Sequence, residues 1–499
     1  MSSSAASRSG LRAGAGAAGL VEAVRARAWD LAIWAGMATW AVALSVVVHG
    51  SFTGFRLGRF DLGNMVQTVW STSEGRLLEM TDGPTGEQMV RFGTHADPFL
   101  ALLAPLWLLW PSPLALAFAQ VVVVSLGALP VFWLGRRHLG SDRVAGLLAL
   151  AYLAYPWLAW SALGAIHPVT FAIPFYLFCI WFLDSNRLAF FGVFAALAMS
   201  TGELMGLPVV GLGLWYALTR GRRWAGAAIA AAGVGWTVLA VFVLVPSARG
   251  ESSLFFGFYD EVGGSPQGVL RKLVTDPGTV LGALVEGRDL VYLVWLALPL
   301  LGLFVLAPGL ALVAVPQLLA NLLSDFRSMT DPRYHSIAAV FPFLIAATVL
   351  GISRLEARRR ERAALAVLVV SAILALGVGP WSRVLGVTPL GGREPLPASR
   401  VDALRDAVAL VPDGAPVASS NVAGAHLSAR RSIFTIPVLG NAEWVLVDRD
   451  DPYVTSPDSP ILLFRPRVPE DVARRLERDA RWTKVFERGS VVVFRKSGP

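Results

Sequence analysis

The chain has 499 residues, of which 55% are hydrophobic and only 16% are charged, and its formal net charge is +8. A soluble domain has about a quarter charged residues, so this composition excludes an ordinary soluble protein and indicates a membrane protein with many spans. The positive charge does not indicate nucleic-acid binding, because the arginines gather in short loops between apolar runs, where membrane topology explains them.

Residues 1–29 are rich in alanine, glycine and serine, and we expect a disordered cytoplasmic tail. A G-x-G-x-x-G pattern at Gly14, Gly16 and Gly19 does not indicate a dinucleotide site, because no strand precedes it. The apolar run 31–50 is too long for the core of a cleaved signal peptide, and no small-residue cleavage site follows it. We therefore expect an uncleaved signal anchor.

A long outer loop with interfacial helices is expected over residues 51–112. After Asp61 the apolar residues recur at helical spacing, which predicts a helix lying flat on the membrane surface with Asp61 at its N-terminus. Capping that helix is the structural alternative for this aspartate. The stretch 98–111 is short and ends in Pro-Ser-Pro, so we interpret it as interfacial or re-entrant.

Apolar runs long enough to cross about 30 Å of hydrocarbon recur as far as residue 380 and predict about eleven spans. Cys179, the single cysteine, lies inside one of them, so no disulfide can form within the chain, and a packing role is favoured. The predicted spans are residues 31–50, 113–135, 144–161, 168–183, 188–201, 204–219, 224–246, 289–307, 309–324, 335–353 and 363–380.

Basic residues in the loops orient these spans by the positive-inside rule. If 98–111 does not cross, most loop arginines fall on the side of the N-terminus, which is then cytoplasmic. An odd number of spans places the C-terminal part outside. The arginines that decide this are Arg136, Arg137, Arg143, Arg187, Arg220, Arg222, Arg223, Arg354, Arg358, Arg359, Arg360 and Arg362.

Beyond Trp381 the pattern changes to short strand-like and helical segments. We expect a mostly α-helical transmembrane domain over 30–381 and a small extracytoplasmic α/β domain over 382–499. Asp448-Arg449-Asp450 imitates the D-x-D metal site of nucleotide-sugar transferases, but the domain is too small for that fold, and a turn is favoured. The expected helices are 401–410 and 471–480, and the expected strands are 417–419, 443–447 and 491–495.

Titratable residues gather at the predicted outer ends of the spans. Glu203 interrupts an apolar run, where a carboxylate costs several kcal/mol unless it faces a polar cavity or a partner. Each histidine there could instead be a hydrogen-bonded packing residue. Together these residues predict an outward-facing pocket with acid/base groups. They are Asp61, His95, Asp97, His167, Glu203, Asp325, Asp331, Arg333 and His335, with His49 at the same face.

The ordered motifs Phe60-Asp61-Leu62-Gly63, His95-Ala96-Asp97-Pro98-Phe99, Ile166-His167-Pro168, Glu203 and Arg333-Tyr334-His335 resemble those of the domain-of-unknown-function 2079 membrane family over about residues 55–450. That family is similar to the GT-C class of membrane glycosyltransferases, which transfer sugars from polyprenyl-phosphate carriers at the outer face. The resemblance implies Asp61 as general base, with Glu203 and His167 also catalytic. The implied substrate-binding residues are His95, Asp97, Arg56, Arg59, Arg333, Tyr334 and His335.

The implied partners are a polyprenyl-phosphate sugar donor, membrane lipid, and an envelope glycan, lipid or protein as acceptor. Gly202-Glu203-Leu204 stands where the family commonly has Lys-Glu-Asp, so no metal ligand is assigned and a divalent metal is left open. Two alternatives also stay open. They are a non-catalytic envelope scaffold or glycan-binding protein, and a lipid or solute transporter, which the absence of a convincing internal repeat disfavours.

Overall fold

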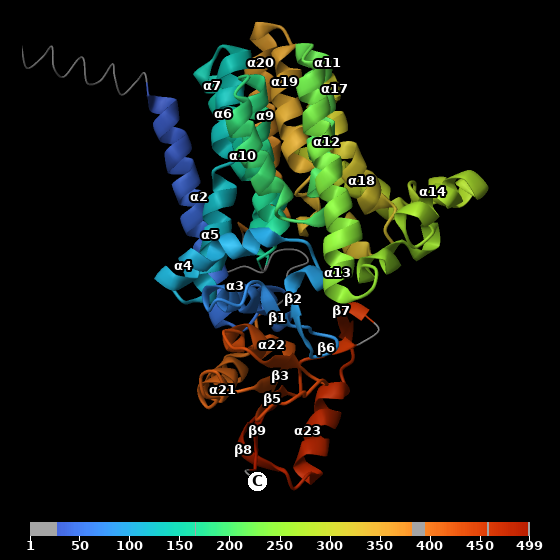
Figure 1. Cartoon of the computed structure of the whole chain (residues 1–499). Helices are drawn as coiled ribbons and strands as arrows, with labels where there is room; N and C mark the ends of the chain where they lie inside the picture. Colours follow the sequence, from blue (N-terminus) through green and yellow to red (C-terminus); the bar gives the residue numbers. More distant parts are fainter. Residues whose placement is uncertain (1–26, 165, 382–394, 457–458, 498–499) are drawn as a thin grey trace, which may run out of the picture.

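The structure is a computed structural model that describes residues 27–164, 166–381, 395–456 and 459–497. It has three levels: a bundle of helices, a layer built from the first long loop, and a C-terminal domain that contains a sheet (Figure 1). The loop layer lies between the other two. Most of the predicted tail, with its G-x-G-x-x-G pattern, falls outside the described residues.

The helices of the bundle pack on one large apolar core. Short 3-10 segments break its second half, and an arm that carries α14 projects from its side (Figure 1). The bundle helices are α2 (Ala28–Thr53), α5 (Pro113–Ser125), α6 (Ala128–Leu139), α7 (Asp142–Ala154), α8 (Pro156–Leu163), α9 (Pro168–Asp184), α10 (Leu188–Met199), α11 (Gly206–Arg220), α12 (Arg223–Leu239), α13 (Val245–Arg249), α16 (Gly287–Ala297), α17 (Pro308–Ala311), α18 (Val315–Leu322), α19 (Phe341–Ser353) and α20 (Ala357–Gly377). The arm contains η6 (Leu254–Val262), α14 (Pro266–Thr275) and α15 (Pro277–Ala283).

The expected eleven full-length spans are not matched by the lengths of the helices. Among the described residues, three helices are long and apolar enough to cross a membrane: Ala28–Thr53, Pro113–Leu139 and Arg223–Arg249. A fourth span results if α7 and α8, bent by 47°, count as one. Other predicted runs form shorter helices, such as α10 with 12 residues, which is only about 18 Å long. The length of an apolar run in the sequence does not show where one helix ends and a proline starts the next.

The charged loops predicted to be cytoplasmic meet at the end of the bundle away from the terminal domain (Figure 1). Arg136 lies 2.7 Å from the carboxylates of both Asp30 and Asp142, and Arg143 lies 3.0 Å from Glu361. α2 begins at this end and ends at the loop layer. The predicted topology, with a cytoplasmic N-terminus and an extracytoplasmic C-terminal domain, requires the basic loops and the terminal domain to lie at opposite ends of the bundle, as they do here.

The first loop is folded and covered by protein on two sides. The helix after Asp61, α3, buries Met65, Val66, Gln67, Thr68, Val69 and Ser71, so it differs from the expected surface helix with one free face. The terminal domain covers the other face. Asp61 does not cap this helix, because the residue at the N-cap is Gly63 and no side chain caps it. The loop contains η1 (Arg59–Gly63), α3 (Asn64–Ser73), β1 (Glu79–Thr81), β2 (Gln88–Val90), η2 (Arg91–Gly93), η3 (Pro98–Leu103) and α4 (Ala104–Leu109).

The terminal domain is a five-stranded mixed sheet in the order β4-β3-β5-β9-β8, with β3 parallel to both of its neighbours. Alternate residues of β9 enter two apolar cores, which shows that the sheet is buried on both faces, one shared with α21 and the other with α23. The elements are α21 (Ala398–Ala409), β3 (Val417–Ser419), α22 (Asn421–Gly424), η13 (Ala425–Leu427), β4 (Ile433–Thr435), β5 (Trp444–Asp448), β6 (Tyr453–Ser456), β7 (Ser459–Phe464), α23 (Val468–Arg478), β8 (Trp482–Arg488) and β9 (Val491–Lys496). The expected helices and strands are therefore confirmed within three residues.

Candidate functional site

Asp61 lies in η1, a π-helical turn, with its side chain accessible. Its carboxylate is 51% exposed, and Oδ1 lies 3.7 Å from Nε2 of His167. π-helical turns are rare and occur frequently at functional sites. The Asp61 carboxylate thus lies beside the imidazole of His167 and remains accessible to solvent.

His167 connects Asp61 to a second histidine. It precedes α9, and its backbone N–H donates to Oε1 of Gln120 at 2.9 Å. Its ring stacks on His335, with the ring centroids 4.0 Å apart. His335 lies in η11 (His335–Ile337), and its Nδ1 is buried without a hydrogen-bond partner among the described groups. Three predicted site residues from distant parts of the sequence thus form one continuous row.

Glu203 and His95 form a second carboxylate–histidine pair. Glu203 lies in η4 (Glu203–Met205), between α10 and α11, and its Oε1 is 3.1 Å from Nδ1 of His95. Its Oε2 accepts from the backbone N–H of Ala96 at 3.3 Å. Burial alone would raise the pKa of the Glu203 carboxyl, but His95 and these hydrogen bonds outweigh burial and hold the pKa below its usual value. His335, which stacks on His167, also interacts electrostatically with His95, so the two pairs are close neighbours.

Asp97 belongs to the wall of the site. It is 2% exposed and accepts a bidentate set of hydrogen bonds from Arg91, with Nη2 at 2.9 Å. Burial raises the pKa of the Asp97 carboxyl, while the Arg91 guanidinium opposes this shift. The pair ties η2 to the start of η3 and places His95 between them.

Arg56 and Arg59, two of the arginines expected to bind substrate, differ in access. Arg56 follows α2 and is partly exposed, and no carboxylate within the described ranges pairs with it. Arg59 is only 1% exposed and donates to Oε1 of Gln67 at 2.9 Å and to the carbonyl of Thr81 at 3.0 Å. Burial lowers the pKa of Arg59 to about 9. Arg56 is therefore the better placed of the two for a ligand.

Arg333 and Tyr334 lie on the surface next to His335. Arg333 forms a bidentate pair with Asp331, with Nη2 donating at 2.6 Å, and this pairing raises its pKa. Tyr334 is exposed. Both side chains border the site, and their assignment to substrate remains a prediction.

No three His, Cys, Asp or Glu side chains in the described part of the chain are grouped to hold a metal ion. The carboxylate–histidine pairs each supply two groups of the kind that bind metals. A divalent metal therefore stays an open prediction.

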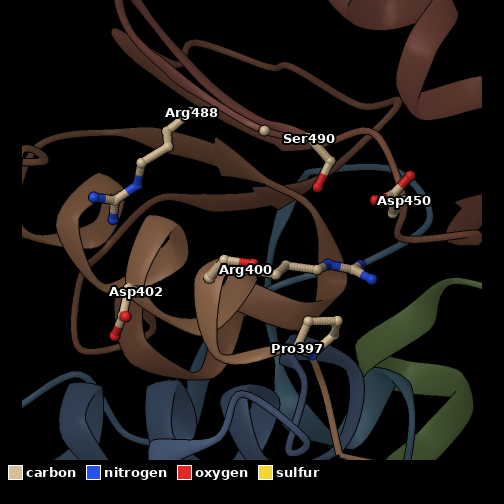
Figure 2. Close-up of a pocket in the computed structure, with 8 residues that line it drawn as sticks. Pro397, Arg400, Asp402, Asp450, Arg488 and Ser490 are labelled. Atoms are coloured by element: carbon tan, nitrogen blue, oxygen red, sulfur yellow. The ribbon is translucent and has the colours of Figure 1, made fainter.

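A cavity of about 530 Å³ lies in the terminal domain, between α21 and the β8–β9 turn (Figure 2). Its arginines already have carboxylate partners: Arg400 lies 2.7 Å from Asp448, and Arg488 lies 2.7 Å from Asp406. Asp448 is buried, and its Oδ1 accepts from the N–H of Asp450 at 3.2 Å. The D-x-D pattern therefore forms a turn, as expected, and the cavity is lined by paired charges.

Sequence reasoning missed several residues around the site. Phe255 stacks on His95, with the ring centroids 4.3 Å apart, and Tyr259 interacts electrostatically with Glu203. Burial, Glu203 and Asp325 together raise the pKa of Tyr259 to about 12. The signal was an aromatic run outside the predicted spans, Phe255-Phe256-Gly257-Phe258-Tyr259. Gln120 is one of two polar side chains, with Ser125, in the otherwise apolar predicted span 113–135.

Comparisons with known proteins concern the whole chain. A family model described as predicted membrane protein (DUF2079) matches residues 53–487. Two crystal structures of ArnT from Cupriavidus metallidurans, one bound to undecaprenyl phosphate and one in the apo state, match 92% of this chain and 98% of theirs. Their TM-scores are 0.51 and 0.50, both at 14% sequence identity, which shows a similar fold. No curated protein matches the chain.

Proposed function

Because this chain belongs to the DUF2079 family of predicted membrane proteins and shares its fold with ArnT, we propose that it transfers a sugar from a polyprenyl-phosphate carrier at the outer face of the membrane. The observation that carries the proposal is the accessible carboxylate of Asp61, paired with His167, in the turn η1 that contacts the terminal domain through Asn421. The ArnT structure with bound undecaprenyl phosphate supports this class of carrier.

The proposed reaction needs one carboxylate as general base. A hydroxyl oxygen of the acceptor forms a bond to the anomeric carbon while Asp61 takes the hydroxyl proton. The bond between that carbon and the phosphate oxygen breaks, and polyprenyl phosphate leaves with the electron pair. Attack from the opposite face inverts the anomeric centre. Phosphate leaves without protonation, so the second carboxylate of a glycosidase is not required.

The other site residues have supporting roles in this proposal. His167 lies against Asp61 and stabilises its carboxylate near the acceptor. Arg56, which lacks a carboxylate partner among the described residues, is placed on the carrier phosphate, because a cation stabilises the departing charge. Glu203 and His95 complete the wall opposite, where they can accept and donate hydrogen bonds to sugar hydroxyls.

The test is turnover by the full chain reconstituted in proteoliposomes. The probes are synthetic undecaprenyl-phosphate-linked sugars, offered as a panel together with an envelope extract as acceptor, and released undecaprenyl phosphate is measured by mass spectrometry. We expect release with at least one donor. Folded protein that binds undecaprenyl phosphate no better than undecaprenol and releases none from any donor would contradict the proposal.

A non-catalytic glycan-binding role is the second candidate. It is favoured by one observation, the replacement of the family's usual Lys-Glu-Asp pattern by Gly202-Glu203-Leu204. Here the neighbour of Glu203 is Leu204 instead of an acid, and the Glu203 carboxylate contacts His95 and the Ala96 N–H. Binding of envelope glycans without release of undecaprenyl phosphate in the same assay would support this alternative.

A further inference from the structure

The terminal domain is docked directly onto the segment that carries Asp61. Phe55, from the first loop, is 3% exposed and belongs to an apolar core of the terminal domain, together with Ala423 and Leu427. His426 stacks on both Phe52 and Phe55, with ring centroids 4.1 Å apart in each case. The chain therefore enters η1 from an anchor that the terminal domain provides.

Asn421 holds the backbone of η1 itself. Its Oδ1 accepts from the N–H of Phe60, the residue before Asp61, at 2.9 Å. A Cβ at Gly58 would lie 2.4 Å from Nδ2 of Asn421, and a Cβ at Gly63 would lie 2.5 Å from Oγ of Ser428. At Gly58, just before η1, and at Gly63, its last residue, the backbone therefore approaches terminal-domain side chains too closely for a Cβ unless those side chains move.

A buried hydrogen-bond network fixes the other side of the turn. Nε2 of Gln67, on α3, donates to the backbone carbonyls of Arg430 at 3.1 Å and Arg431 at 2.9 Å. Its Oε1 accepts from Arg59 within η1 at 2.9 Å. Gln67 is 1% exposed, and both the oxygen and the nitrogen of its buried amide are hydrogen-bonded, whereas Nε and Nη1 of Arg59 have no hydrogen-bond partner among the described groups. The Gln67 amide therefore ties α3 to the terminal domain.

We propose that the segment Ser420–Arg431 is the platform that positions Asp61 against His167, with Asn421 as the principal positioning residue. The segment lies more than 350 positions from Asp61 in the sequence, as the span of the Asn421 contact shows. The terminal domain thereby contributes to the site without touching substrate. The expected effect of this platform on turnover rests on the proposed function, whereas its effect on the position of Asp61 does not.

The first test measures position without any substrate. Cys179 is the single native cysteine, so a Cys179→Ala background with Asp61→Cys and His167→Cys contains one reactive pair. A short bis-methanethiosulfonate reagent then reports how often the two side chains meet. We expect Asn421→Ala to lower the cross-linking yield about fivefold, the effect of one lost neutral hydrogen bond. Asn441→Ala, in an exposed turn of the same domain, is the matched control and should leave the yield unchanged. Equal yields in folded Asn421→Ala and the control would overturn the proposal.

A second pair of variants keeps the test decisive if Asn421→Ala does not fold. Gly63→Ala should lower the yield, because its methyl group meets Oγ of Ser428. Adding Ser428→Ala removes that oxygen, the closest atom, and leaves only the flexible Arg59 side chain, with Cδ at 3.0 Å, to adjust, so it should restore most of the yield. Failure of Ser428→Ala to restore it would contradict a platform in direct contact with η1.

Turnover of the undecaprenyl-phosphate-linked donor separates this proposal from the function it serves. Asn421→Ala should lower kcat with KM for the donor unchanged, and Asn421→Asp, which keeps an oxygen acceptor for Phe60, should retain most of kcat. If Asn421→Ala loses cross-linking but keeps normal turnover, the role of Asp61 as base is contradicted, while the proposal that Asn421 positions Asp61 still stands. Retained cross-linking with lost turnover contradicts the positioning role of Asn421.

Discussion

Two aspartates at opposite ends of the bundle show how the same side chain is used for structure and left available for chemistry. Asp184 is 4% exposed on its side chain and lies within 3.1 Å of three basic partners: Arg137, His138 and Arg220. Asp61 is 51% exposed and has His167 at 3.7 Å. A carboxylate with every oxygen engaged stabilises an interface between helices, whereas an open carboxylate beside one imidazole can accept a proton.

The largest effect on stability is expected at the inner end. Asp184→Ala removes the shared acceptor of three basic side chains, and we expect a loss of about 3 kcal/mol in the free energy of unfolding. Donor turnover per folded molecule should not change. The measurement is denaturant unfolding in detergent together with turnover at matched folded concentration. A specific loss of turnover without destabilisation would break the comparison.

A smaller effect, on activity, is expected for the second carboxylate of the outer end. Glu203→Gln replaces a charge-assisted hydrogen bond to His95 with a neutral one, so donor turnover should fall about five- to tenfold. Glu251→Gln is the matched control, because Glu251 is an exposed carboxylate paired with Arg249. Equal turnover in the two variants would remove Glu203 from the site.

The smallest effect concerns pH and the docking of the terminal domain. Burial lowers the pKa of His426 to about 4, below the usual value of 6.5. As pH falls, His426 is protonated in the unfolded chain before it is protonated in the folded protein. The stability that depends on neutral His426 is therefore fully present above pH 6.5 and is lost as pH falls toward 4. We expect Tm to drop by a few degrees between pH 7 and pH 5. His426→Phe keeps an aromatic ring between Phe52 and Phe55 and should remove this part of the drop, and an unchanged drop would contradict it.

The sequence predicts the elements of the terminal domain better than the helices of the bundle. Val491–Lys496 begins with three valines and a phenylalanine, which favour a strand, and Val417–Ser419 is a short segment between turns, so both strands were found. β8 was missed because it is an edge strand with charged residues at Lys484 and Arg488. The length of the apolar runs overestimated the length of the helices, because a run of apolar residues does not show where a helix breaks.

The site could be predicted as a set of residues but not as a set of pairs. Asp61, His167, Glu203 and His95 were identified by type and by their places at the ends of spans. Which carboxylate meets which histidine depends on tertiary packing, for which one sequence holds no signal. The contact of Asn421 with Phe60 joins residues separated by 361 positions and was invisible for the same reason.

The open carboxylate of Asp61 is the proposed general base. The most direct measurement compares Asp61→Asn with Asp184→Asn in the donor-turnover assay, each at matched folded concentration in proteoliposomes. We expect Asp61→Asn to lose about 100- to 10,000-fold in kcat, the usual contribution of a general base, with undecaprenyl phosphate binding retained. Asp184→Asn should turn over normally once folded. Full turnover by Asp61→Asn would contradict the account.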